Sequence, residues 1–234
     1  MANKNTKSTK VEETTTVVIP NMIRENVHVP IVGTSSLIVH QFSDKVKATI
    51  LNKQLGTANK GREKRDPISD FVNSLHFLNG ANREDIIDKL HKDKVQIGSD
   101  VASYFKEIPL GFPASGFKKA AVGACRNVEG IPMTLARGAF FINEDSSGMV
   151  KINYDQLIFR QDTVRLSGRN GVTDLRFRGE FRNWKALLSV ELNPRALSAD
   201  QVFNLIDVSG FSVGVGEWRP EKDGSNGRFM VERG

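Results

Sequence analysis

The pattern of apolar and polar positions opens with a strand followed by a helix. From Val27 the run VHVPIVGTSSLIVHQF is dominated by apolar and β-branched residues, and Pro30 interrupts it, which predicts a bent strand at a sheet edge or a bulge. Residues 43–56 then carry apolar side chains at a helical spacing and end at a glycine, so we expect a helix there.

Further helices and strands follow along the chain. Short helical patterns occupy residues 67–75 and 82–98. A helix rich in small residues, suited to close packing on a sheet, is predicted over residues 113–126. The run IPMTLARGAFFIN at 131–143 is predicted to be a strand with a bulge at Arg137–Gly138.

Residues 160–182 predict a β-hairpin, because the turn sequence SGRNG separates two segments of alternating polar and apolar residues. One face is predicted to be apolar and to contain Val164, Leu166, Leu175 and Phe177. The other face is predicted to carry Arg165, Arg176 and Arg178, with Arg169 at the tip. Guanidinium groups pair with phosphate through two hydrogen bonds and stack on bases, so we interpret the hairpin as a projection that contacts nucleic acid.

The C-terminal part predicts a strand, a capped helix and a second strand. Residues 184–192 alternate as a half-buried strand, and Ser198 with Gln201 has the spacing of a capping box. We expect the helix to end at Gly210 and a strand to follow at 211–214.

The stretch Val213–Val231 combines glycines with a tryptophan and several basic residues. Gly214 and Gly216 allow a tight turn and a close approach to a partner, and Trp218 offers a ring for stacking. The basic residues of the stretch are Arg219, Lys222 and Arg228. They indicate that the partner is anionic.

Basic residues gather in two further places. The first is a stretch without apolar residues that contains Lys60, Arg62, Lys64 and Arg65. It indicates a mobile loop that either contacts phosphate or is merely solvated. The second is the helix predicted from Pro113, which carries Lys118, Lys119 and Arg126. The N-terminus of such a helix offers free N–H groups and a positive dipole end to a phosphate.

Composition limits the classes of function. The 234 residues include 33 Lys+Arg against 27 Asp+Glu, which gives a net charge of +6 and a moderate bias toward polyanions, although an ordinary basic surface is the alternative. Cys125 is the only cysteine and the four histidines are scattered, so we expect no disulfide, no metal site and no cofactor. No apolar run approaches the roughly 18 residues of a membrane span, so we expect a cytoplasmic protein.

The chain is expected to consist of a tail and one domain. Residues 1–20 begin with a polar segment that has almost nothing to bury, so we expect a disordered tail. A single nucleic-acid-binding domain is expected over residues 21–234, with insertions at about 56–108 and 160–182.

The order of these elements predicts an α+β fold of the ferredoxin-like or RNA-recognition type, with an antiparallel sheet, insertions and a C-terminal glycine-rich loop. Three stretches resemble the RAMP superfamily, the ferredoxin-like proteins that form the backbone of CRISPR effector complexes. They are Ile31–His40, Gly111–Ala120 and Gly214–Phe229. The chain looks most similar to backbone subunits and to phage or prophage relatives of them.

The resemblance implies roles for two parts of the chain. The start of the helix within Gly111–Ala120 is implied to face a guide backbone, and the hairpin is implied to be a thumb that inserts into the nucleic acid and separates its bases. Family members that cut RNA use a loop aspartate or a histidine, and neither is placed by this sequence. Asp162 and Asp174 flank the hairpin, but beside arginines we expect them to be salt-bridge partners.

These observations predict a non-catalytic, largely sequence-independent protein that binds single-stranded RNA or DNA and assembles as repeated subunits, a homo-oligomer or filament along the strand. Stacking would come from Trp218 or Phe112. Two alternatives stay open: a RAMP-type nuclease that uses Asp162, Asp174 or His40, and a structural subunit that contacts proteins but no nucleic acid. The predicted binding residues are Lys60, Arg62, Lys64, Arg65, Phe112, Lys118, Lys119, Arg126, Arg165, Arg169, Arg176, Arg178, Gly214, Gly216, Trp218, Arg219, Lys222 and Arg228.

Overall fold

The computed structural model describes residues 19–41, 51–52, 54–55, 65–143, 147–165 and 173–233. Several predictions therefore fall outside the described residues. They concern residues 1–18 of the expected tail, the first part of the helix expected at 43–56, the hairpin tip with Leu166 and Arg169, and the basic residues Lys60, Arg62 and Lys64. Of the helix at 43–56, the described residues Leu51, Asn52 and Gln54 are helical.

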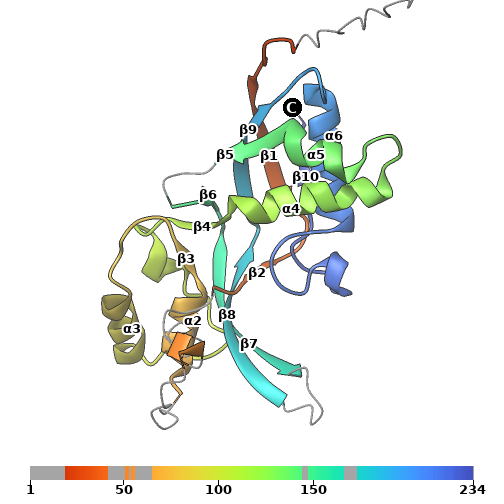
Figure 1. The fold of residues 1–234 in the computed structure, drawn as a ribbon. Coiled ribbons are helices and arrows are strands. Elements are labelled where there is room, and N and C mark those ends of the chain that lie inside the picture. The colour runs from red at the N-terminus through yellow and green to blue at the C-terminus, as the bar shows by residue number, and fades with distance from the viewer. Residues whose placement is uncertain are drawn as a thin grey trace, which may run out of the picture.

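Four antiparallel strands form the central sheet in the spatial order β10-β1-β9-β5 (Figure 1). Of the helices between β1 and β5 in the chain, α4 packs with this sheet, and α6 lies between β9 and β10. The bounds of these elements are β1 Glu25–Gly33, α4 Ala114–Ala124, β5 Phe140–Asn143, β9 Lys185–Leu192, α6 Ala199–Ser212 and β10 Phe229–Val231. This β-α-β-β-α-β succession is the ferredoxin-like arrangement, so the predicted fold class is confirmed.

The helices α4 and α6 pack against each other and against one face of the central sheet (Figure 1). That face is apolar because the strands alternate: in β9 the side chains of Ala186, Leu188 and Val190 are buried, as the sequence pattern predicted. The opposite face carries Leu187 and Met230, both exposed, and no described helix covers it.

Two smaller sheets complete the structure. One has the order β2-β8-β7 and consists of β2 Leu37–Val39, β7 Gln156–Arg165 and β8 Thr173–Arg182. The other has the order β3-β4-β6 and consists of β3 His76–Phe77, β4 Leu110–Pro113 and β6 Met149–Lys151. The strands β7 and β8 form a long ribbon that extends away from the central sheet (Figure 1), so the predicted hairpin strands are confirmed.

The two helices predicted between the basic stretch at residues 60–65 and Pro113 are present. Helix α2 covers Pro67–Ser74 and is capped by Asp66, whose carboxylate accepts hydrogen bonds from two backbone N–H groups of its first turn. Helix α3 covers Arg83–Lys92 and is capped by Asn82. The remaining described helices are α5 Met133–Ala139 and the short 3₁₀ turns η1 Ala102–Phe105, η2 Cys125–Asn127 and η3 Pro220–Lys222. None of the described helices is long and apolar enough to span a membrane.

Two predictions of secondary structure were wrong. The strand expected over 131–143 is a helix, α5, followed by the four-residue strand β5, and Gly138 is a helical residue rather than a bulge. Pro132 stands at the N-cap of α5, and the buried Ala136 and Ala139 are three residues apart, so this segment packs as a helix against its surroundings.

The helix expected to end at Gly210 continues to Ser212, and no strand forms at 211–214. A Cβ atom on Gly210 would lie 2.0 Å from the carbonyl oxygen of Phe229. The glycine therefore permits α6 to pack closely on β10 and does not end the helix.

Candidate nucleic-acid interface

A groove of about 380 Å³ runs between the N-terminal half of α4 and the glycine-rich loop, which we define as residues 213–228. Pro113, Gly116 and Lys119 line it from the helix, and Gly214 to Glu217 line it from the loop. His40 and His76 lie in the same lining. The groove thus brings together residues from the three stretches that carry the family resemblance, which are far apart in the sequence.

Backbone hydrogen bonds hold the glycine-rich loop against β2 and the residue before it. The N–H of Glu217 donates to the carbonyl of Ile38 at 2.9 Å, and the N–H of Gly227 donates to the carbonyl of Ser36 at 2.7 Å. Within the loop, the N–H of Val215 donates to the carbonyl of Gly227 at 2.9 Å. The loop wall of the groove is therefore fixed by its own backbone pairing.

The glycines of the loop serve this packing. Gly216 has φ +76°, and a Cβ atom there would lie 2.4 Å from the carbonyl oxygen of Ile38. Gly214 has φ +68°, and its Cβ would lie 2.7 Å from Cδ of Pro220. The close approach predicted at these two glycines is thus made to the protein itself, although both residues still line the groove.

Trp218 and Arg219 differ in how much they are committed to the fold. Trp218 adopts φ +55°, which is uncommon for a residue with a side chain, and it remains 40% exposed next to the groove. Arg219 donates to the carbonyl of Gly216 at 3.0 Å and to the carboxylate of Glu221 at 2.9 Å. Its guanidinium braces the loop, whereas the Trp218 ring is available for stacking.

The two adjacent lysines of α4 face different surroundings. Lys119 lines the groove. Lys118 is turned away from it: its ammonium donates to the carbonyls of Ala136, at 2.8 Å, and Phe140, and lies 3.5 Å from the centre of the Phe140 ring. Burial lowers the pKa of Lys118 to about 8. The predicted phosphate contact by Lys118 is corrected, because hydrogen bonds to these carbonyls hold its ammonium between α4, α5 and β5.

Of the other predicted binding residues near the groove, one is buried and the rest are at least partly exposed. Phe112 is buried, with its ring 5.4 Å from that of Phe117 in an edge-to-face arrangement, so the predicted stacking by Phe112 is corrected. Arg126 is exposed and lies 3.7 Å from Glu221 on the loop. Lys222 is exposed, and Arg228 donates from Nε to the carbonyl of Ser225 within the same loop.

The ribbon does not present a single arginine face. In the register of β7 and β8, Arg165 lies opposite Thr173 and Asp162 lies opposite Arg176. Because opposite residues share a face and faces alternate along a strand, Arg165 lies on the side of Leu175, and Arg176 and Arg178 lie on the other side. The predicted grouping of all three arginines is therefore wrong.

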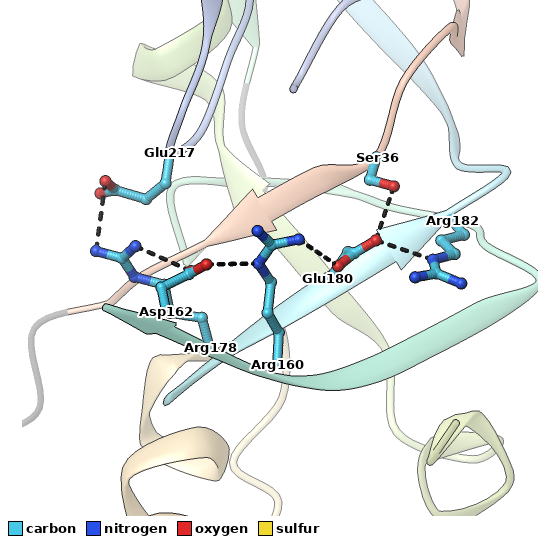
Figure 2. A network of polar contacts seen from close by, with 7 residues as sticks. All are labelled: Ser36, Arg160, Asp162, Arg178, Glu180, Arg182 and Glu217. Carbon is cyan, nitrogen blue, oxygen red and sulfur yellow. Dashed lines mark hydrogen bonds and ion pairs between the residues drawn. The ribbon is translucent and has the colours of Figure 1, made fainter. Parts of the chain in front are cut away.

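Arg178 is buried in a network of charged residues that Figure 2 shows. It donates to Asp162 at 3.2 Å and lies 3.6 Å from Glu217 of the glycine-rich loop. Arg160 donates to Asp162 at 2.7 Å and to Glu180 at 2.8 Å. Since its guanidinium is enclosed by carboxylates, Arg178 links the ribbon to the loop, and its predicted direct contact with nucleic acid is corrected.

The network continues through Glu180 to the segment before β2. Arg182 and Ser36 each donate to the Glu180 carboxylate at 2.9 Å (Figure 2). Burial alone would raise the pKa of Glu180, but the hydrogen bonds from Arg160, Arg182 and Ser36 lower it below its ordinary value. Glu180 is thus a stable anion that joins β7, β8 and the backbone leading into β2.

Arg65 is the described end of the basic stretch, and it is anchored on the ribbon. Its guanidinium donates to Asp174 at 2.8 Å and lies 5.4 Å from the centre of the Phe177 ring. Asp174 also pairs with Arg176 at 2.9 Å. The expectation that Asp162 and Asp174 are salt-bridge partners is confirmed.

The third residue of the nuclease alternative, His40, lies in the groove. Its Nε2 is 3.5 Å from Nη1 of Arg176. Burial, with a further contribution from Arg178, lowers its pKa. Within the part of the chain that the structure describes, no three His, Cys, Asp or Glu side chains are grouped to hold a metal ion.

Sequence reasoning did not select Glu217, Glu180, Arg160 or His76 as site residues. The sequence did contain a signal for the charged network of Figure 2: charges of opposite sign alternate at positions 160, 162, 178, 180 and 182 of a predicted hairpin. The contact from Glu217 depends on a tertiary approach between the loop and the ribbon, which no local pattern specifies.

The chain matches no protein-family model. It also has no match among curated proteins. Among solved structures, it is similar to Cmr6 from Pyrococcus furiosus, with 13% sequence identity and a TM-score of 0.37 over 91% of this chain and 100% of that one.

Proposed function

We propose that the protein is a non-catalytic, largely sequence-independent binder of single-stranded nucleic acid and that it holds the strand in the groove between α4 and the glycine-rich loop. One observation carries the proposal. The groove has a helix N-terminus and Lys119 on one wall and a braced glycine-rich loop on the other, and the exposed Trp218 stands in that loop between the lining residues Glu217 and Arg219. This pairing of phosphate attraction with a stacking ring is what binding of single strands requires.

The wall formed by α4 supplies the positive potential. The helix has 11 residues and no acidic residue in its first turn, so the partial positive charge of its N-terminus is not neutralised there. Lys119 adds a full charge one turn further along. A phosphodiester that lies along this wall meets backbone N–H groups and an ammonium together.

Basic residues outside the groove extend the surface. Arg126, Lys222 and Arg228 are exposed or half-buried around the glycine-rich loop. Arg165 and Arg176 lie on the ribbon, on opposite faces. Contacts of this kind depend on phosphate charge and not on base identity, so the proposed binding is sequence-independent and strongly dependent on salt.

We further propose that copies of the protein lie side by side along the strand, as the resemblance to RAMP backbone subunits implies. Asp162, Asp174 and His40 serve as structural residues in this proposal, because each contacts an arginine of the ribbon. Cleavage of nucleic acid is the alternative that the experiments must exclude.

The test is a titration of labelled 20-nucleotide RNA and DNA by fluorescence anisotropy at several salt concentrations. We expect affinity to fall steeply with salt for both strands and Lys119→Ala to weaken binding. Lys92→Ala, which removes an exposed charge on α3 away from the groove, is the matched control and should bind as the wild type. Affinity without salt dependence would refute the proposal.

Incubation of the same labelled strands with and without magnesium separates binding from cleavage. Intact strands after incubation are the expected result. Progressive loss of full-length strand that disappears in Asp162→Asn or His40→Ala, measured where circular dichroism shows the variant to be folded, would establish the nuclease instead. Native mass spectrometry that shows no bound oligonucleotide at any salt concentration would support a purely structural subunit.

A further inference from the structure

The face of the central sheet that no described helix covers carries a contiguous apolar patch, which we define as Pro30, Val32, Leu187 and Met230. The register places Pro30 opposite Leu187, and Val32 opposite Met230, on three adjacent strands. Leu187 is 57% exposed and Met230 is 51% exposed. Exposed apolar side chains at neighbouring register positions are typical of an interaction surface.

The outer strands of the same sheet are less suited to pairing with another strand. The N–H of Val231 in β10 donates to the carboxylate of Asp207 at 2.8 Å. The carbonyl of Phe140 in β5 accepts a hydrogen bond from Lys118. Because side chains already take these backbone groups, an approaching segment is expected to dock on the face and not to add at an edge.

A second apolar surface precedes β1. We call residues 19–23, with the sequence IPNMI, the arm. Ile19 is 86% exposed, Met22 is 60% exposed and Ile23 is 47% exposed. The arm continues beyond the end of β1 and does not fold back on the sheet (Figure 1).

The base of the arm is fixed by an ion pair. Arg24 lies 3.3 Å from Glu191, next to the end of β1 at which the arm leaves. The patch begins further along β1, at Pro30 and Val32, so the arm leaves the sheet at the end distant from Val32. The arm and the patch of one chain are thus two separate, unpartnered apolar surfaces.

We propose that the arm of one copy packs on the patch of the next copy. Neither the arm nor the four patch residues carry a charge. The charged neighbours of the patch, Lys185 opposite Val32 and Glu232, are exposed and pair with each other at 3.9 Å. The arm and the patch are different surfaces of the same chain, which makes the contact head-to-tail and repeatable from copy to copy. This extends the side-by-side assembly of the proposed function by naming the surfaces that join the copies, and on that point it rests on the proposed function.

The test uses two variants of the full chain and their mixture, without nucleic acid. The arm variant is Ile19→Asp with Met22→Asp and Ile23→Asp, and the patch variant is Leu187→Asp with Met230→Asp. Sedimentation velocity at tens of micromolar protein should show concentration-dependent association of the wild type and monomers for each variant. The equimolar mixture should form one-to-one dimers and nothing larger, because one intact arm and one intact patch remain in each pair.

Phe211→Asp is the control, since Phe211 is 75% exposed on α6 but belongs to neither surface, and this variant should associate as the wild type does. A monomeric wild type would overturn the proposal, as would variants that still associate or a mixture that stays monomeric. Circular dichroism melts check that each variant is folded. Both variants should bind an oligonucleotide that is short enough for one copy as the wild type does. If the wild type associates as expected but binds no oligonucleotide, only the proposed function is refuted.

Discussion

Substitution of Lys118 and of Lys119 should separate an effect on stability from an effect on binding. The two residues are adjacent on α4, but we expect the first substitution to lower Tm and the second to weaken strand binding. Lys118→Met keeps the aliphatic stem but leaves the carbonyls of Ala136 and Phe140 without their donor. Lys119→Met removes a charge from the groove and breaks no hydrogen bond recorded in the described part of the chain.

The expected magnitudes follow from these contacts. Loss of a donor to the carbonyls of buried residues costs about 1–3 kcal/mol, and in a chain of this size each kcal/mol lowers Tm by about 2–4 °C. Lys118→Met should therefore lower Tm by several degrees and leave the affinity of the folded protein unchanged. Lys119→Met should leave Tm unchanged and lower the slope of log K against log salt by about 0.7, the value for one phosphate contact on a single strand.

Differential scanning fluorimetry gives Tm, and fluorescence anisotropy from 50 to 200 mM salt gives the slope. Raising the salt from 50 to 200 mM weakens the binding of both proteins. With a slope change of about 0.7, the factor by which Lys119→Met weakens should be about 2.6-fold smaller than the factor for the wild type. Lys92→Met on α3 is the matched control for both measurements. The reasoning fails if Lys119→Met destabilises the protein or if Lys118→Met changes the salt slope at temperatures where it is folded.

Three further predictions concern the groove and the network. Burial lowers the pKa of His76 to about 4 from its ordinary 6.5, so the unfolded chain binds more protons in this window and stability should fall as pH drops from about 6.5 to about 4; His76→Gln should flatten that part of a urea-denaturation series. Asp162→Asn should cost about 3–5 kcal/mol because Asp162 and Arg178 are both buried, whereas Glu217→Gln should cost less than about 1 kcal/mol because Glu217 is half exposed; equal costs by chemical denaturation would contradict this ranking. Trp218→Ala should weaken strand binding by about 1–3 kcal/mol at unchanged Tm, measured by anisotropy, and full affinity would show that the ring does not stack.

The sequence was sufficient for the order of the main elements but not for several of their boundaries. Alternation in 184–192 and the capping box at Ser198 are local signals, and both the strand and the helix start were found. Gly210 was misread as a helix end, because a glycine that ends a helix and a glycine that lets a helix approach a strand look alike in sequence. The distance to Phe229 that distinguishes them exists only in the folded chain.

The candidate site shows the same division between local and tertiary information. The sequence selected both the helix from Pro113 and the glycine-rich loop as candidate binding elements, and the structure places them on two walls of one groove. It could not tell which of the two lysines faces the groove, since that depends on α5 and β5 packing around Lys118. It also could not assign the faces of the ribbon, which follow from the register between strands and not from each strand alone.

The two walls of the groove differ in charge, and under the proposed function this difference would orient a bound strand. The α4 wall offers a helix N-terminus and Lys119, whereas the loop wall carries the carboxylates of Glu217 and Glu221. Phosphate is attracted by the first wall, whereas on the second wall the carboxylates of Glu221 and Glu217 are paired with Arg219 and Arg178, so the backbone of a strand is expected to follow α4. Its bases then face the loop, where Trp218 is exposed. Glu217 of the loop wall also contacts Arg178 of the ribbon (Figure 2). The buried network therefore connects the ribbon to the wall that the bases are expected to face.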